Sequence, residues 1–252
     1  MFGILKERIH QQYRTLDYPA KEPFLPERFR GKPVLKATHC GDCRLCLEAC
    51  PSKALMRRGE AMPVLDLGRC LFCGACARVC PKSAIHFSRD YKLFARSRSE
   101  LLLTGPSEKA DCQTKPAGKA SIFKRSLKLR QVSCGGCAAC EADTNVLGTL
   151  LYDLGRFGID FVASPRHADG ILVTGPVTKN MAQALFDTYR AVPDPRLVIA
   201  VGSCAISGGL FADSPECLGG LPEEIPVDLY VPGCPPNPWS ILAGLLALQK
   251  NR

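Results

Sequence analysis

The sequence predicts two domains in tandem: a small α+β domain that binds metal through cysteines, followed by an open doubly wound α/β domain. Three observations predict this arrangement. Two cysteine-rich segments repeat at an offset of 30 residues, 15 cysteines occur among 252 residues, and the second half alternates short apolar runs with helical segments. The length has room for two ordinary domains, and a hydrophobic content of 46% is enough for a core.

The cysteine content indicates metal binding rather than disulfides. The N-terminal stretch MFGILKERIHQQYR has no apolar signal-peptide core, so we expect a cytoplasmic chain. The longest apolar stretches, such as residues 241–248, are too short to span a bilayer. Cysteines in a cytosolic chain are more often metal ligands or reactive groups than disulfides.

The formal net charge of +9 at pH 7 does not indicate a nucleic-acid partner. Metal centres bound by cysteine thiolates carry negative charge of their own and would reduce this excess. Lys and Arg outnumber Asp and Glu by 11 to 4 between residues 89 and 130. This stretch is either a basic surface, which could contact a membrane or an acidic partner, or a solvated linker. We favour the linker.

The repeated segments are CGDCRLCLEACPSKAL from Cys40 and CLFCGACARVCPKSAI from Cys70. Each follows the pattern C-x2-C-x2-C-x3-C-P of two-cluster bacterial ferredoxins, in which the fourth cysteine binds the other cluster. Zinc is the alternative for any CxxC, but two complete copies argue against it. The pattern predicts two ligand sets, one made of Cys40, Cys43, Cys46 and Cys80, and the other of Cys70, Cys73, Cys76 and Cys50.

From Gln131 onward, apolar runs typical of buried parallel strands alternate with helical segments. The expected strands are residues 159–163, 170–174, 196–201 and 227–231. Residues 177–192 are expected to form a helix with one apolar face, made of Met181, Ala184, Leu185 and Tyr189. The pattern predicts a doubly wound, flavodoxin-like sheet, in which sites form at the carboxyl ends of the strands.

Cysteines at two of these strand ends predict a third cluster. Cys204 follows the third expected strand and Cys234 follows the fourth. The stretch CGGCAACE, residues 134–141, offers three further cysteines at a period of three: Cys134, Cys137 and Cys140. Spacing alone leaves open which two of them complete the set.

Residues 131–252 resemble the small subunit of NiFe hydrogenases of the membrane-bound, formate hydrogenlyase type, and its relative, the 20 kDa subunit of complex I. The resemblance rests on CAACE, YDLGRFGIDFVASPRHADGILVTGPVTKNM, DPRLVIAVGSCA and IPVDLYVPGCPPNP. Residues 16–100 are similar to the ferredoxin-like subunit of the same complexes, through FRGKP, LGRCLFCGACARVCP and YKLF. The chain therefore resembles a fusion of two subunits.

In the resembling family a CxxC followed by Glu opens a helix before the YDL segment. This resemblance implies that the third 4Fe–4S cluster is held by Cys137, Cys140, Cys204 and Cys234. Cys134 is then not a ligand, although it lies close enough in the sequence to replace one if the other two cysteines were chosen wrongly. Cys112 and Cys217 are also left without a cluster. Complex I relatives carry two adjacent cysteines at this position, so CxxC favours the hydrogenase branch.

Glu141 has two readings. It is either an acid stabilised by the dipole at a helix N-terminus or, as the resemblance implies, a residue at the large-subunit interface that takes part in a proton route. Phe2, Leu5 and Ile9 fall on one face of a short N-terminal helix that could rest on a membrane surface or a partner. An unanchored end is the alternative.

The expected organisation is an N-terminal extension over 1–30, a two-cluster ferredoxin domain over 31–100, a basic linker over 101–130 and a small-subunit, 20 kDa-like domain over 131–252. The resemblance implies an electron-transfer subunit without a catalytic NiFe centre of its own, which serves the NiFe site of a separate large subunit.

The implied partners are that large subunit, membrane subunits of an energy-converting complex, and a donor such as formate dehydrogenase or a soluble ferredoxin. The implied location is the cytoplasmic face of the inner membrane. Two alternatives are a nickel-free, complex I-like oxidoreductase and a free cluster carrier, and the carrier is ranked last because it would not need the long α/β domain.

Overall fold

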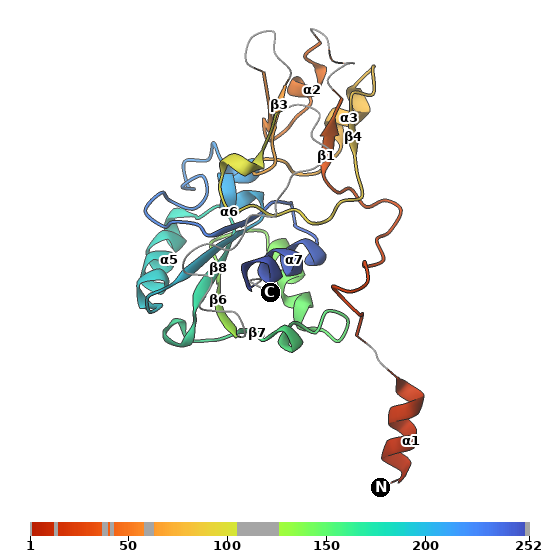
Figure 1. Ribbon diagram of the computed structural model, residues 1–252. Coiled ribbons are helices and arrows are strands. Elements are labelled where there is room, and N and C mark those ends of the chain that lie inside the picture. Colours follow the sequence, from red (N-terminus) through yellow and green to blue (C-terminus); the bar gives the residue numbers. More distant parts are fainter. Residues whose placement is uncertain are drawn as a thin grey trace.

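The computed structural model describes residues 2–12, 15–36, 40, 43–57, 63–104 and 126–249. A cysteine-rich lobe, formed by the described residues between 33 and 104, stands at one end of a larger α/β lobe, residues 126–249 (Figure 1). The N-terminal helix α1, Phe2–Gln11, extends away from both lobes.

The cysteine-rich lobe contains two small antiparallel sheets. One pairs β1 (Pro33–Leu35) with β4 (Ile85–Phe87); the other has the order β2 (Leu55–Met56), β3 (Val64–Asp66), β5 (Leu102–Thr104), with a 3₁₀ turn, Ser99–Leu101, before β5. The short helices α2 (Leu45–Glu48) and α3 (Ala75–Val79) carry cysteines. The sequence repeat extends to the backbone, because Lys53 and Ser83, 30 residues apart, both have a positive φ, of 53° and 48°.

The α/β lobe is built on a parallel sheet with the strand order β10-β9-β8-β6-β7. Its strands are β6 (Leu127–Ser133), β7 (Ile159–Phe161), β8 (Gly170–Thr174), β9 (Leu197–Val201) and β10 (Leu229–Val231). Its helices are α4 (Ala139–Asn145), α5 (Lys179–Ala191), α6 (Ser203–Ser207) and α7 (Pro238–Gln249), with 3₁₀ turns at Val146–Gly148, Leu154–Phe157, Pro165–His167 and Gly209–Phe211. β7 lies on one side of β6, whereas β8, β9 and β10 follow on its other side. The strand order therefore reverses between β6 and β8, and open α/β sheets bind their ligands at such a point.

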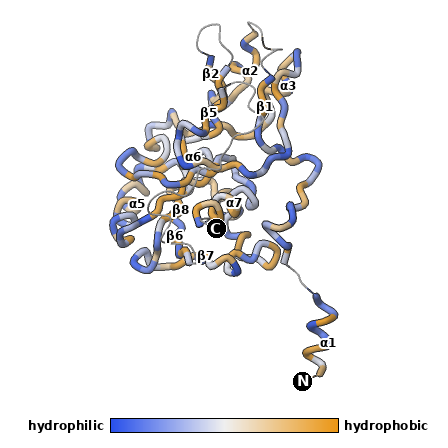
Figure 2. Tube along the Cα trace, in the orientation of Figure 1, coloured by the Kyte–Doolittle hydropathy of each residue, from blue (hydrophilic) through white to orange (hydrophobic). Residues whose placement is uncertain are grey.

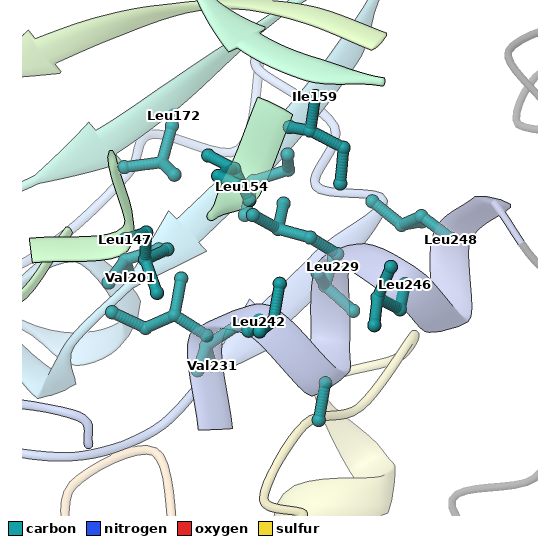
Figure 3. Packing of buried hydrophobic residues seen from close by; sticks show 14 of the residues in the cluster. Leu147, Leu154, Ile159, Leu172, Val201, Leu229, Val231, Leu242, Leu246 and Leu248 are labelled. Atoms are coloured by element: carbon teal, nitrogen blue, oxygen red, sulfur yellow. The ribbon is translucent and has the colours of Figure 1, made fainter. Parts of the chain in front are cut away.

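Each face of the sheet buries its own apolar cluster. The larger cluster joins α7 to one face, where Leu172, Val201 and Leu229 meet Leu242 and neighbouring residues (Figure 3). The smaller cluster lies under α5 on the opposite face and includes Leu185. Because successive strand residues point to opposite faces, Leu172 joins the first cluster and Val173 the second. The lobe therefore has three layers.

The interior strand β6 was not expected from the sequence. It lies between β7 and β8, and it begins at Leu127, inside the stretch 101–130 that was expected to be a linker. Leu127 and Leu129 are fully buried, whereas Lys128 is exposed. This alternation hid the strand from a search for continuous apolar runs. The expected linker also contributes β5, and its residues 105–125, including Cys112, lie outside the described residues.

The other expected elements of this lobe are present with small differences. β8 covers residues 170–174 as predicted, while β7, β9 and β10 are shorter than expected. α5 is present, but Ala184 is exposed. Ala182 and Phe186 instead join Met181, Leu185 and Tyr189 against the sheet, because the buried stripe is centred on Leu185.

The apolar side chains of α1 are exposed. Phe2 and Ile9 are 89% and 76% exposed, and hydrophobic and hydrophilic residues alternate along this helix (Figure 2). The predicted face is therefore unpaired within the described residues. None of the helices in the described part of the chain combines the length and apolar character needed to cross a membrane.

Asp66, at the end of β3, is a buried carboxylate that holds a turn at the contact between the two lobes. Its side chain is 4% exposed and accepts hydrogen bonds from both terminal nitrogens of Arg98 and from the Gly68 amide, at 2.8 Å. The Gly68 carbonyl in turn accepts a hydrogen bond from Ser207 Oγ of the α/β lobe, at 2.9 Å. Asp66 therefore orders the turn that meets α6.

Replacement of Asp66 with alanine is expected to lower the free energy of unfolding by about 2–3 kcal/mol, because Arg98 and the Gly68 amide lose their acceptor. This is less than a fully buried pair would lose, since the Arg98 side chain is 36% exposed. The measurement is the Tm of the anaerobically purified chain. Asp213→Ala is the control, because its ion pair with Lys53 is exposed and should contribute less than about 1 kcal/mol. Equal losses in both variants would contradict the role of Asp66.

Candidate iron–sulfur sites

The first thiol set, Cys40, Cys43, Cys46 and Cys80, lines a single cavity in the cysteine-rich lobe. Leu35, Leu45 and Ile85 form its apolar wall. Burial raises the pKa of the Cys46 thiol, and so do its three thiol neighbours: Cys40, Cys80 and Cys43. The structure therefore brings together the four cysteines that the sequence pattern grouped.

The second thiol set, Cys50, Cys70, Cys73 and Cys76, lines a second cavity in the same lobe. Burial raises the pKa of Cys70 to about 12 and that of Cys76 to about 11. Backbone amides point at the sulfurs. The Ala54 amide donates to Cys50 Sγ at 3.2 Å, and the Ala84 amide donates to Cys80 Sγ of the first set at 3.2 Å. Such hydrogen bonds are a recognised determinant of cluster potential.

The third thiol set, Cys137, Cys140, Cys204 and Cys234, gathers at the carboxyl ends of the parallel strands. Cys140 lies in α4, which follows β6; Cys204 lies in α6, which follows β9; and Cys234 follows β10. Burial raises the pKa of Cys140 to about 12, and three thiols add to the rise: Cys204, Cys234 and Cys137.

Cys134 lies apart from this set. Its side chain is fully buried in the apolar cluster under α5, whereas Cys140 packs against the cluster on the α7 face. Burial raises the pKa of Cys134 to about 12, with Glu141 as the neighbouring charge. Cys217 is half-buried, and its thiol interacts electrostatically with Cys204.

Glu141 is held at the sheet edge rather than free in solution. The hydroxyls of Ser133, at the end of β6, and Thr174, at the end of β8, each donate to Glu141 Oε1 at 2.6 Å. Burial raises the pKa of Glu141, but these two hydrogen bonds and that of its own backbone amide outweigh burial and lower it. The side chain is thus a carboxylate that bridges the two strands at the reversal point.

Sequence reasoning missed the contacts that join the second and third sets. Ser203 is 1% exposed, and its Oγ lies 2.7 Å from the Cys70 carbonyl and 3.1 Å from the Gly233 carbonyl. The hydroxyl of a residue next to Cys204 therefore contacts a ligand position of the second set and the neighbour of Cys234. No local signal identifies this contact, because 133 residues separate Ser203 from Cys70.

Replacement of Ser203 with alanine is expected to cost about 1–2 kcal/mol of stability. The Cys70 carbonyl would lose this donor in a buried position, whereas the Gly233 carbonyl would keep the Ser203 amide at 2.8 Å. A fall in Tm of several degrees would measure the loss. Ser97→Ala, which removes an exposed hydroxyl bonded to Ser99, should leave the Tm unchanged. An unchanged Tm for Ser203→Ala would show that the contact contributes nothing.

The donor chemistry fits iron–sulfur clusters. Each set supplies four thiols, the ligands that such clusters use, and the first two sets each line a cavity of their own. Thiolates around one zinc ion, with Zn–S of about 2.3 Å, would lie within about 4 Å of one another. Among the described residues, no three His, Cys, Asp or Glu side chains are gathered closely enough to hold a single metal ion.

The three sets follow one another through the molecule. The Cys76 thiol of the second set interacts electrostatically with Cys46 of the first. The Cys234 thiol of the third interacts in the same way with Cys73 of the second. Cys73 and Cys234 both line a hollow of about 480 Å³ between the lobes. The second set therefore stands between the other two.

Comparison with protein families gives two matches. Residues 39–84 match the 4Fe–4S dicluster domain, and residues 137–248 match the 20 kDa subunit of NADH ubiquinone oxidoreductase. The fold and thiol sets thus define an iron–sulfur protein in which a dicluster domain precedes an α/β redox-subunit domain.

Three relatives show how far the similarity extends. The probable membrane-bound hydrogenase subunit mbhJ of Pyrococcus furiosus is 42% identical over 149 residues, which cover 59% of this chain and 89% of the relative. Formate hydrogenlyase subunit 7 of Escherichia coli is 44% identical over 50% of this chain and 51% of its own length. A subunit of the NADH-quinone oxidoreductase of Citrifermentans bemidjiense is 47% identical over 45% of this chain and 66% of its own length. This chain therefore spans about half of the Escherichia coli subunit.

The chain belongs to the family of the NADH ubiquinone oxidoreductase 20 kDa subunit and its hydrogenase relatives, and it carries a 4Fe–4S dicluster domain in front. The expected tandem of a ferredoxin-like domain and a 20 kDa-like domain is confirmed. The chain is accordingly an oxidoreductase subunit, and its dicluster domain supports a role in electron transfer.

Proposed function

We propose that this chain is the iron–sulfur electron-transfer subunit of a membrane-associated, energy-converting NiFe hydrogenase of the formate hydrogenlyase type. It would pass electrons through three 4Fe–4S clusters to or from the NiFe site of a separate large subunit, for H2 evolution or uptake. The observation that carries the proposal is the serial order of the three thiol sets, in which Cys46 neighbours Cys76 and Cys73 neighbours Cys234.

In this proposal each thiol set holds one cluster, and the cluster supplies a one-electron acceptor and donor. The protein's part is to keep the sets in fixed order, to exclude water from the more buried sulfurs, and to donate amide hydrogen bonds to the thiolates. Counted along the chain from β6, the strand order is 2-1-3-4-5, which supports a flavodoxin-like sheet. We propose domain boundaries shifted from the expected 31–100 and 131–252, so that β5 (to Thr104) belongs to the first domain and β6 (from Leu127) to the second.

The proposed partners are the NiFe large subunit, membrane subunits of the complex, and a donor oxidoreductase such as formate dehydrogenase or a soluble ferredoxin. The names of the Pyrococcus furiosus and Escherichia coli relatives support the first two. The chain would then sit peripherally on the cytoplasmic face of the inner membrane. The exposed apolar residues of α1 offer one contact surface for such partners.

A nickel-free, complex I-like oxidoreductase is the second candidate. The similarity to the NADH-quinone oxidoreductase subunit of Citrifermentans bemidjiense favours it. The separation of Cys137 from Cys140 by two residues favours the hydrogenase, since it is the CxxC spacing expected of that branch. This chain would transfer electrons in both candidates, which differ in whether the large subunit contains nickel.

The native complex, purified anaerobically through a tag on this chain, tests the proposal. We expect about thirteen iron atoms from this chain and the large subunit, twelve in three four-iron clusters and one in the NiFe site, together with stoichiometric nickel and H2-dependent viologen reduction. Twelve irons without nickel or H2 activity would replace the hydrogenase with the nickel-free candidate. About eight irons would contradict the three-cluster proposal itself.

A further inference from the structure

Residues 15–31 form a segment, here called the N-terminal strap, that lies outside both family matches and contacts both lobes. Tyr18 is buried, and its ring lies 5.0 Å from that of Trp239 on α7 and 6.4 Å from that of Tyr91. Arg89 donates to the carbonyls of Leu25 and Pro26 in the strap. The strap is therefore held along its length and carries Arg30 to the second thiol set.

Arg30 and Arg78 converge on one carbonyl of the second set. Arg30 Nη1 donates to the Cys73 carbonyl at 3.0 Å and to the Phe72 carbonyl at 3.1 Å. Arg78 Nη1, from α3, donates to the same Cys73 carbonyl at 3.1 Å. A Cβ built on Gly74 would lie 3.3 Å from Arg30 Nε and 3.5 Å from Arg78 Nη1. Two guanidinium groups thus flank one ligand loop.

Neither of these two like charges is paired with an acidic side chain in the described part of the chain. Both guanidiniums bond backbone carbonyls there and form no ion pair. The neighbouring cations differ in this respect, since Lys53 pairs with Asp213 at 3.0 Å and Arg69 lies 4.0 Å from Asp66. Two adjacent positive charges repel each other, so their placement favours an anion nearby. Four thiolates around a 4Fe–4S core carry about −2, and a one-electron reduction makes this about −3.

We propose that Arg30 and Arg78 raise the midpoint potential of the cluster on Cys50, Cys70, Cys73 and Cys76 by stabilising its reduced form. The inference rests on the proposed function, because it requires a cluster on the second set. Neither arginine touches a thiol, so both act through charge placed beside the ligand loop. The two arginines lie beside Cys73, whose thiol interacts with Cys234 of the third set. They therefore favour the reduced state of the second cluster on the side next to the third.

Removal of both charges is expected to lower the ratio of reduced to oxidised second cluster about tenfold at a fixed potential. Tenfold corresponds to about 59 mV for a one-electron couple. Each single change should account for part of this shift. Both side chains are exposed, so solvent screening keeps the effect modest and makes it smaller at high salt.

The test is an anaerobic redox titration of the full chain, monitored by EPR, with mediators setting the potential. The second cluster is identified as the signal altered by Cys73→Ser. Arg30→Gln, Arg78→Gln and the double variant should lower its midpoint, whereas Arg30→Lys and Arg78→Lys, which keep the charge, should not. Arg190→Gln, an exposed arginine on α5, is the matched control and should shift nothing.

The outcomes separate this inference from the proposed function. A Cys73-dependent signal that the Gln variants leave unmoved would overturn the inference and leave the function standing. The absence of any Cys73-dependent signal in the wild-type chain would overturn the function. If the double Gln variant loses the cluster, the single Gln variants decide: a lowered midpoint supports the charge effect, and an unchanged midpoint overturns it.

Discussion

Replacement of Cys137 with alanine is expected to remove about four of the roughly twelve iron atoms per chain, whereas Cys134→Ala should leave the iron content unchanged. The two thiols are three residues apart, but their surroundings differ. Cys137 is exposed and interacts electrostatically with Cys140, Cys204 and Cys234. Cys134 is buried in the apolar cluster under α5.

The measurement is iron per chain in the anaerobically purified protein, with EPR of the reduced state to count clusters. Because Cys137 is exposed, its replacement leaves no cavity in an apolar core, and retention of the first two cluster signals would show that lost iron reports ligation rather than unfolding. Cys134→Ala leaves a small cavity and should cost about 1 kcal/mol without iron loss. The reverse pattern would assign Cys134 to the third cluster. Cys217→Ala tests the thiol near Cys204 and should also retain all iron.

Replacement of Gly202 with alanine is expected to prevent assembly of the third cluster. Gly202 follows β9 and has φ of +92°, where an L side chain is strained by about 1 kcal/mol or more. The added Cβ would lie 2.6 Å from Cys140 Sγ, which is closer than such atoms can approach. Either the Cys140 thiol or the loop before Cys204 must move, and the four sulfurs would no longer surround one cluster.

Iron content near eight atoms per chain, with the signals of the first two clusters intact, is the expected result for Gly202→Ala. Gly148→Ala is the matched control, because a Cβ there would meet nothing within 4 Å and φ is not positive. It should retain all three clusters. Full iron content in Gly202→Ala would mean that the third site tolerates the displacement, and that Cys140 is not constrained as the structure indicates.

Local spacing was sufficient to propose the first two thiol sets. The complete C-x2-C-x2-C-x3-C-P pattern lets three cysteines wrap one cluster, and its repeat at an offset of 30 residues supplies the fourth ligand of each cluster. The expected strand over residues 170–174 was also confirmed, because it is buried on both faces and reads as a continuous apolar run.

Long-range packing decided what the sequence left open. β6 was missed because Lys128 and Arg130 interrupt its apolar pattern, although it lies inside the sheet, between β8 and β7. Its end at Ser133 sends Cys134 into the core under α5, and the turn at Gly135, with φ of +83°, brings the chain back so that Cys137 and Cys140 reach the strand ends. A period of three contains no such information, since it treats the three cysteines alike.

The contacts between the lobes also depend on tertiary structure alone. Ser203 meets Cys70 across 133 residues, and Arg30 meets Cys73 across 43. Neither residue belongs to a recognisable motif, because a hydroxyl or guanidinium that bonds a distant backbone carbonyl places no constraint on its sequence neighbours. The ligands of the first two clusters could therefore be proposed from local order. The position of the second set beside the third, and the charge at that junction, follow only from the way the two lobes pack.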